Sequence, residues 1–190
     1  IGGYIVAGST LSGTWHPFLT RVDKIGTVLW AKTYPQPGVD EHFLDVTKTH
    51  WATYSLFAAV GQADGVAALG TGMDDYFIMV NGAGVPLYTR RFLTREADLA
   101  VHIEPIIHSV YGAGYVIAGK TIHNLTTLDS DVHVIITDKT GSLVKSAVWL
   151  FPLDQEVKWI EPTKDGGFIV TGTSKVTQTC DPDNNVIFVM

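Results

Sequence analysis

The chain has 190 residues, of which 46% are hydrophobic, so it is long and apolar enough to fold around its own core. Its formal charge of −6 argues against nucleic acid or an anionic membrane surface as a partner, and its apolar runs are too short for membrane insertion. The single cysteine, Cys180, excludes an internal disulfide framework and a cysteine-based zinc cage.

A short motif recurs four times: an aromatic residue, three apolar or small residues and a glycine. The copies begin at Tyr4, Phe57, Tyr115 and Phe168, at similar but unequal intervals along the chain. Their β-branched and aromatic composition predicts a β-strand in each copy. No window sustains the 3.6-residue apolar period of a helix, so the sequence predicts an all-β fold.

Two further elements recur in phase with this motif. Turn signals with Asp or Asn first and Gly last separate two apolar runs, which predicts a β-hairpin in each copy: Asp23 to Gly26, Asn81 to Gly84 and Asp138 to Gly141. One more strand-like stretch precedes three of the motifs: His42 to Thr49, Asp98 to Ile107 and Val157 to Thr163. The repeating unit therefore has four strands.

The units cover residues 1–34, 42–92, 97–151 and 157–190 of a single domain, 1–190. Tandem four-stranded units of this length are typical of a β-propeller, here an incomplete set of about 3.5 repeats. A two-sheet sandwich is the alternative, but it does not explain why whole units recur. Because propellers have at least four blades, we expect the chain to be part of a longer polypeptide or of an assembly.

Two segments, Asp165 to Ser174 and Phe18 to Tyr34, resemble the WD40-like propeller repeats of bacterial and archaeal secreted or surface proteins. The resemblance extends over nearly the whole chain. It implies four-stranded antiparallel blades, an extracellular or cell-surface location, and a scaffold or adhesive role.

Two patterns look like ligand sites. Gly114 to Thr121 fits the P-loop pattern, but its strand-like composition and the absence of a following helix predict a plain strand that ends near Lys120.

Acidic pairs precede the third strand of each unit, at Asp74-Asp75, at Asp129 and Asp131, and at Asp181, Asp183 and Asn185. We interpret them as Asx-turns, with the last group as the best candidate for Ca²⁺; no other cofactor is predicted.

In a propeller the first strand of each unit lines the central channel, so its polar residues are candidate site residues. They are His42, Asp45, Asp98, His102, Glu104, Glu156, Lys158 and Glu161. His102 and Glu104 have the residue types of a metal site or an acid–base pair, but we interpret these residues as solvated channel-wall or strand-end residues. Arg90, Arg91 and Arg95 are interpreted as a solvated charged edge.

Four of the five tryptophans divide into two groups. Trp30 and Trp149 lie within predicted strands and are expected to pack between blades, whereas Trp15 and Trp51 lie in predicted loops and could stack on a sugar ring.

No catalytic signature survives these tests, so the sequence predicts a non-enzymatic scaffold or binding module with a protein or glycan partner. The alternatives are a propeller enzyme, acting on glycans or as a quinone-dependent dehydrogenase, and a structural filament subunit.

Overall fold

The computed structural model describes residues 2–52, 54–64, 72–93, 96–108, 110–124, 129–150, 154–175 and 185–189. Within these ranges the chain forms fourteen β-strands and no α-helix. The prediction of an all-β fold is therefore confirmed. It follows that the described residues contain no helix long and apolar enough to cross a bilayer.

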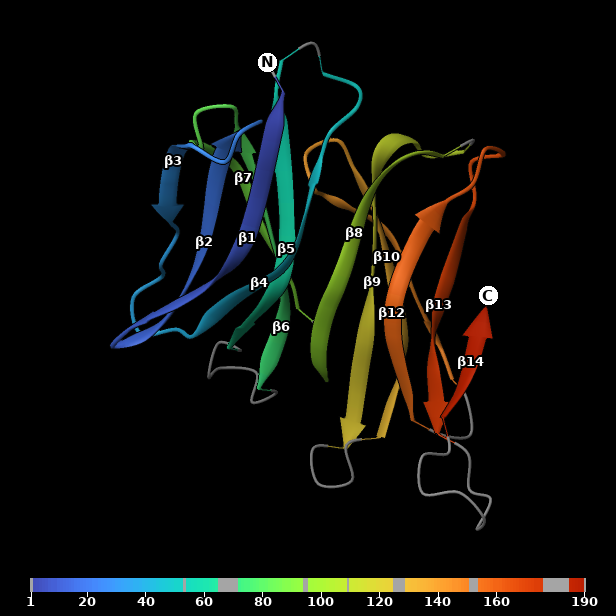
Figure 1. Ribbon diagram of the computed structural model, residues 1–190. Helices are drawn as coiled ribbons and strands as arrows, with labels where there is room; N and C mark the ends of the chain where they lie inside the picture. The colour runs from blue at the N-terminus through green and yellow to red at the C-terminus, as the bar shows by residue number, and fades with distance from the viewer. Residues whose placement is uncertain are drawn as a thin grey trace.

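The strands form four antiparallel sheets in which the spatial order follows the chain order (Figure 1). Sheet I contains β1 (Gly3–Ser12), β2 (Thr14–Asp23) and β3 (Val28–Thr33). Sheet II contains β4 (Glu41–Lys48), β5 (Leu56–Asp64), β6 (Met73–Asn81) and β7 (Pro86–Phe92). Sheet III contains β8 (Ala97–His108), β9 (Gly112–Asn124), β10 (Asp129–Asp138) and β11 (Leu143–Trp149). Sheet IV contains β12 (Gln155–Pro162), β13 (Phe168–Lys175) and β14 (Asn185–Val189).

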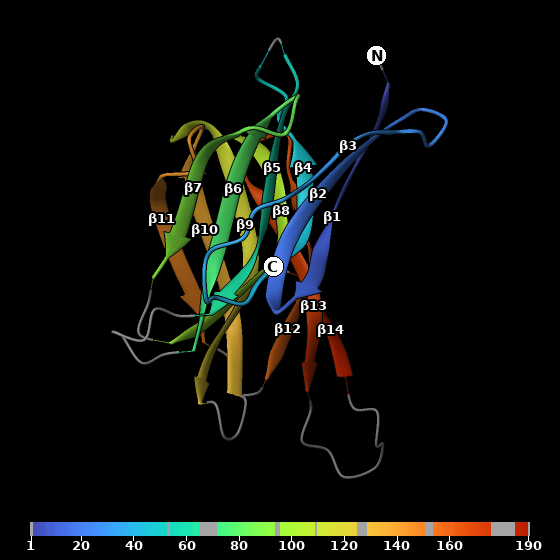
Figure 2. The ribbon, with the colours of Figure 1, turned by 90° about the vertical axis from the view of Figure 1, so that its left-hand side faces the viewer.

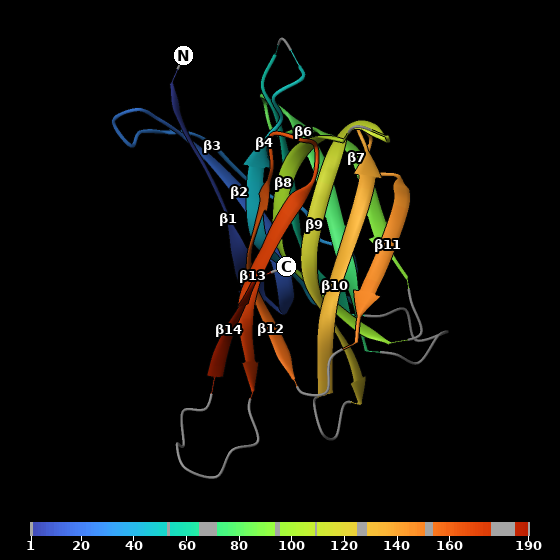
Figure 3. The same ribbon diagram turned by 90° about the vertical axis from the view of Figure 1, so that its right-hand side faces the viewer.

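The four sheets stack face to face, as the two side views show (Figures 2 and 3). We call β4, β8 and β12, the first strands of sheets II, III and IV, the leading strands. Each leading strand packs against the preceding sheet: β4 against β1 and β2, β8 against β4, β5 and β6, and β12 against β8, β9 and β10. Sheets I and IV lie at opposite ends, so the stack is open (Figure 1).

The predicted hairpin turns are present and share one geometry. Gly26, Gly84 and Gly141 close them with φ of 90°, 70° and 76°, values that favour glycine. The Asp or Asn side chain that begins each turn accepts two backbone N–H groups; Asp23, for example, accepts those of Ile25 and Thr27 at 2.9 Å. The same turn therefore joins the last two strands of sheets I, II and III.

Three hydrophobic cores fill the spaces between neighbouring sheets. Strand alternation divides β5 between two of them, because Ala58 and Val60 face sheet III whereas Phe57 and Ala59 face sheet I. Likewise Ile117 of β9 faces sheet II, and its neighbours along the strand face sheet IV. Central strands buried on both faces explain why the apolar runs in the sequence are continuous rather than alternating.

The P-loop pattern lies entirely inside β9. Gly114 pairs with Asp138 and Lys120 pairs with Val132, so the segment is an extended strand and not a phosphate-binding loop. Gly114 and Gly119 lie against the backbone of neighbouring strands, where a Cβ atom would overlap a carbonyl group. Both glycines are thus explained by strand packing; the segment is a strand, as predicted, but β9 continues past Lys120 to Asn124.

Candidate functional site

Each leading strand carries one extra residue that breaks its register with the next strand of its sheet. The bulged residues are Leu44, Val101 and Lys158, which are equally spaced along the chain. The glycine that ends the recurring motif lies opposite the bulge in all three sheets, at Gly61, Gly119 and Gly172. The repeat therefore encodes a bulge, a device that redirects the side chains beside it.

The glycine is sterically required in two of these sheets. A Cβ on Gly61 would overlap the carbonyl oxygen of His42, and one on Gly119 would overlap that of Leu99. In both cases the conflicting carbonyl belongs to the leading strand, just before the bulge. The motif glycine thus permits the close approach that the bulge creates.

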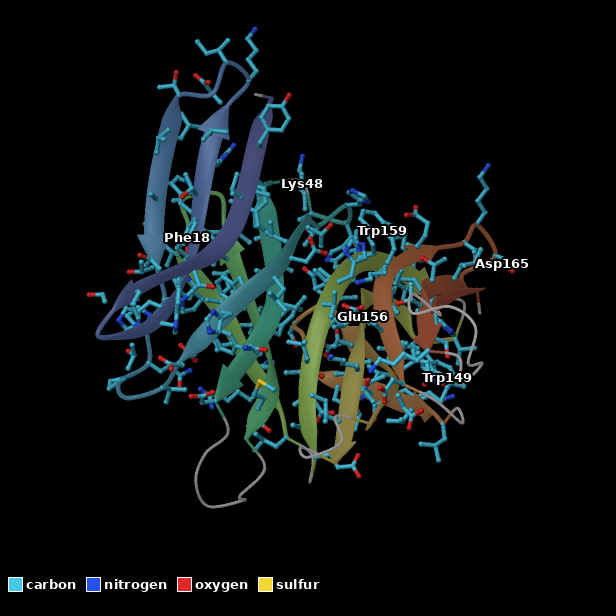
Figure 4. The ribbon with its side chains drawn as sticks, turned by 60° about the horizontal axis from the view of Figure 1, so that its bottom comes forward. Phe18, Lys48, Trp149, Glu156, Trp159 and Asp165 are labelled. Atoms are coloured by element: carbon cyan, nitrogen blue, oxygen red, sulfur yellow. The ribbon has the colours of Figure 1, made fainter. Side chains whose placement is uncertain are left out.

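The residue after each bulge contacts its counterpart in the next sheet. These residues are Asp45, His102 and Trp159, with the same equal spacing as the bulges, and we call them the His102 row. Nδ1 of His102 lies 2.5 Å from Oδ2 of Asp45, and its ring centroid lies 4.0 Å from that of Trp159, at an interplanar angle of 32°. The row therefore joins sheets II, III and IV, and Figure 4 shows Trp159 on β12 beside β8.

Other polar contacts hold the members of the row in place. Asp45 also accepts the backbone N–H of Ile103 at 2.9 Å and that of Val46 at 2.8 Å. The indole N–H of Trp159 donates to Glu161 at 3.2 Å. Glu104 lies 3.5 Å from Nε2 of His102, the distance of an ion pair, and this buried Nε2 has no hydrogen-bond partner among the described atoms.

These contacts fix the charge of His102. Burial of the ring disfavours the imidazolium, but the hydrogen bond to Asp45 and the nearby charge of Glu104 outweigh it and raise the pKa of His102 to about 9. At neutral pH the ring is consequently a cation between two carboxylates, with Trp159 over one face. The row can hold three sheets together, but it offers no free base.

The other polar residues of the leading strands do not converge on this row. His42 bonds Ser9, at 2.9 Å, and Asp98 accepts the hydroxyl of Thr121, at 2.7 Å. Glu156 and Lys158 form an exposed ion pair at 2.8 Å.

The metal prediction lies mostly outside the described residues. Asp181 and Asp183 fall there, and Asn185 is described only as the first residue of β14, where it pairs with Lys175. The described part of the chain contains no group of three or more His, Cys, Asp or Glu side chains arranged to hold a metal ion. The Ca²⁺ site stays a prediction.

Trp15 does not lie in a loop, as the sequence had suggested, but in β2, where it pairs with Leu11. Its side chain remains 39% exposed, and its ring centroid lies 5.2 Å from that of His42. The carboxylate of Asp40 accepts its backbone N–H at 2.6 Å. Trp15 is thus an exposed aromatic group held beside a histidine and a carboxylate.

Trp51 is outside the strands, as predicted, but it is not an open stacking surface. Its ring packs edge-on against that of Tyr115, with centroids 5.0 Å apart, and it covers the core between sheets II and III. Trp30 and Trp149 pack against the cores between sheets, in agreement with the sequence.

A second histidine cluster is buried between sheets II and III, and the sequence analysis did not predict it. Nδ1 of His133 lies 3.4 Å from Oδ2 of Asp75 and 3.7 Å from Oδ1 of Asp98. The interpretation of Asp74-Asp75 as an Asx-turn is wrong, because both residues lie within β6 and are buried. A histidine inside the apolar run Val132 to Ile136 was the available signal, since such a position requires a polar partner.

The interpretation of Arg91 as part of a solvated edge is also wrong. Its guanidinium donates to Glu41 at 3.0 Å and to Gln36 at 3.2 Å, and the side chain of Glu41 is fully buried. Burial raises the pKa of Glu41, and the contact with Arg91 opposes that rise. Arg91 thus provides the charge that a buried carboxylate needs.

Comparison with known proteins does not add to this description. No family model matches the sequence, and a search of curated proteins finds no significantly similar chain. The resemblance to WD40-like repeats stays a prediction, and function has to be inferred from the geometry.

Proposed function

We propose that the chain is a segment of a β-propeller, with its four sheets as successive blades. Three features support this arrangement: each leading strand packs on the preceding sheet, the bulges recur at equal intervals, and the His102 row runs along the leading strands. A two-sheet sandwich would not produce four stacked sheets with one recurring interface.

Within this arrangement we propose a non-enzymatic scaffold and binding role. The observation that carries the proposal is that the ionisable groups of the His102 row are engaged with one another. A general base must be unprotonated near the working pH, whereas His102, with a pKa of about 9, is an imidazolium there. The enzyme alternative would need these same groups.

Trp15 offers the most suitable contact surface for a glycan or protein partner. Flat aromatic faces stack on sugar rings and on peptide side chains, and polar groups beside them fix the orientation of the ligand. His42 lies beside the exposed ring of Trp15, Asp40 accepts the backbone N–H of Trp15, and Ser9 bonds His42. An extracellular or cell-surface location would suit this role and stays a prediction.

A glycan and peptide array followed by calorimetry on the hits tests the proposal. We expect Trp15→Ala to weaken binding at least tenfold, which corresponds to about 1.4 kcal/mol. Tyr88→Ala is the matched control, since it removes an aromatic side chain of similar exposure, 38%, from β7 of a different sheet, and it should leave affinity within twofold.

The same ligands should also be assayed for turnover. Catalytic conversion of a bound glycan that disappears in His102→Ala and Glu104→Ala would establish the enzyme alternative. Binding that Trp15→Ala does not change would contradict the assignment of Trp15.

A further inference from the structure

Two cavities open between successive sheets, beside the outer strands. The first lies between the end of sheet I and strands β6 and β7 of sheet II, with a volume of about 500 Å³. The second lies between β7 of sheet II and strands β10 and β11 of sheet III, with a volume of about 360 Å³ (Figure 2). Cavities of about 300–1,000 Å³ are typical of small-molecule sites, and each of these has both of its walls within the chain.

One wall of each cavity is formed by equivalent positions of the repeat. It begins at the residue that pairs with the motif glycine, continues at the second residue after it, and includes the hydroxyl residue that pairs with that one on the outer strand. These positions hold Tyr76, Ile78 and Thr89 in the first cavity and His133, Ile135 and Ser146 in the second. The repeat therefore encodes this wall, as it encodes the bulge.

The opposite wall comes from the preceding sheet and carries a cation two residues before an aromatic ring. These residues are Lys32 and Tyr34 in the first cavity and Arg90 and Phe92 in the second. The two cations also share one register, because Leu19 and Phe77, their partners on the central strands, each follow the residue opposite the motif glycine. The position of the cation is thus a property of the repeat.

Both cavities are basic, although the chain is acidic. The chain has 19 acidic against 13 basic residues, yet no acidic side chain of the described residues lines either cavity. Within the described ranges, no carboxylate forms an ion pair with Lys32 or Arg90. Arg90 donates to the carbonyl of Thr89 at 2.9 Å and to Oγ of Ser142 at 3.5 Å. These bonds use only some of its N–H groups, so others can bind a ligand carboxylate.

The other cationic groups beside the second cavity already have carboxylate partners. Arg91 donates to Glu41, and His133 faces Asp75. Arg90 is therefore the cation that a ligand can engage there. The aromatic ring and the isoleucine of the lining give the rest of the ligand an apolar surface.

We propose that each cavity binds a small organic carboxylate, with the carboxylate on Lys32 or Arg90 and the apolar body against the aromatic ring and the isoleucine. A cation alone would attract any anion, and an apolar wall alone would accept any apolar group. The two together select an anion with an apolar body. These sites are separate from the surface proposed around Trp15, since Trp15 lines neither cavity, and they do not require the sheets to belong to a propeller.

NMR titration of methyl-labelled protein tests both cavities at once, because the methyl signals of Ile78 and Ile135 report them separately. The probe is phenylpropionate, which combines an aromatic ring with a carboxylate. Phenylpropanol and phenylpropylamine are matched compounds that differ only in the headgroup. We expect phenylpropionate to shift both signals and to bind about tenfold more tightly than the alcohol, and the amine to bind more weakly than the alcohol.

The two cation substitutions serve as controls for each other. Arg90→Gln should weaken binding at Ile135 about tenfold and leave binding at Ile78 unchanged, and Lys32→Gln should do the reverse. Lys24→Gln removes an exposed charge from the β2–β3 turn, which lines neither cavity, and should change neither titration. Far-UV circular dichroism checks that each variant keeps the fold.

Four results would overturn the proposal. They are an alcohol that binds as tightly as the acid, methyl shifts that neither cation substitution reduces, no shift with phenylpropionate up to about 10 mM, and an acidic peptide that binds where phenylpropionate does not. The last result would assign the cavities to a protein partner. Trp15→Ala should change neither titration, so a failure here leaves the binding role of Trp15 standing, and the reverse also holds.

Discussion

Sheet III holds two histidines that each take a carboxylate from sheet II, and the two sites behave differently. His102 faces Asp45 at the leading edge of the stack, and His133 faces Asp75 inside the interface. Both rings also have a second carboxylate on their own sheet, Glu104 for His102 and Asp98 for His133. The partners are alike, so the difference comes from solvent.

The side chains of Asp45 and Glu104 are about a quarter exposed, at 25% and 24%, whereas that of Asp75 is 3% exposed. The carboxylates of Asp45 and Glu104 raise the pKa of His102 against the effect of its burial. Burial raises the pKa of Asp75 to about 6, while the contact with His133 opposes that rise. A histidine and an aspartate therefore form an ion pair at the edge of the stack, at His102 and Asp45. In the core, at His133 and Asp75, burial disfavours the charged form of the aspartate.

The largest expected effect is on stability when each histidine is removed. His133→Ala leaves Asp75 and Asp98 buried without their cation, and we expect it to cost about 3–5 kcal/mol in the free energy of unfolding. His102→Ala leaves carboxylates that water can reach, so its cost should be about 1–2 kcal/mol. Urea unfolding at pH 6 measures both values.

His50→Ala, at an exposed position between β4 and β5, is the control and should change stability by less than about 0.5 kcal/mol. If His102→Ala proved as costly as His133→Ala, solvent would not be what distinguishes the two sites.

A smaller effect is expected in the pH dependence of stability. The folded-state pKa of Asp75 is raised above its ordinary value of 3.8 to about 6, so the folded chain keeps a proton that the unfolded chain loses. Stability from this group is present below pH 4 and is lost as the pH rises through 6. Asp75→Asn should flatten the stability curve between pH 4 and 6. A slope that the substitution does not change would mean that another group produces it.

His102 contributes to the same curve at higher pH. Its folded-state pKa of about 9 lies above the ordinary value of 6.5, so its contribution is complete below pH 6.5 and is lost as the pH rises through 9. The two sites should therefore appear as two separate declines in stability.

Strand content and turns could be predicted from the sequence because their causes are local. Asp23, Asn81 and Asp138 determine their turns through their own backbone neighbours, and the alternating and continuous apolar runs define the strands. His102 was a candidate for the same reason, since a polar residue in a leading strand is visible without a structure.

The side-chain pairs that form between distant strands could not be predicted, because the sequence of one segment does not show which other strand it packs against. Asp75 and His133 come from different sheets, and Arg91 and Glu41 come from the two edge strands of sheet II, yet each pair meets in the fold. The equal spacing of the His102 row was present in the sequence. It was not recognised because the recurring aromatic motif has unequal spacings along the chain. The bulged residues Leu44, Val101 and Lys158, in contrast, are equally spaced.

The smallest expected effect is a change in the pKa of His102, which NMR titration of its ring signals measures. Asp45 lies 2.5 Å from Nδ1 and Glu104 lies 3.5 Å from Nε2, so Asp45→Asn should lower this pKa from about 9 further toward 6.5 than Glu104→Gln does. Both substitutions keep the shape of the side chain and remove its charge, and each replaces one acceptor oxygen by an NH2 donor; in Asp45 both oxygens accept N–H groups, so its substitution also costs a hydrogen bond. The signals of His133 serve as the internal control, because its carboxylates are unchanged in both variants. Equal shifts from the two substitutions would mean that overall negative charge, rather than the hydrogen bond from His102 to Asp45, keeps this ring protonated.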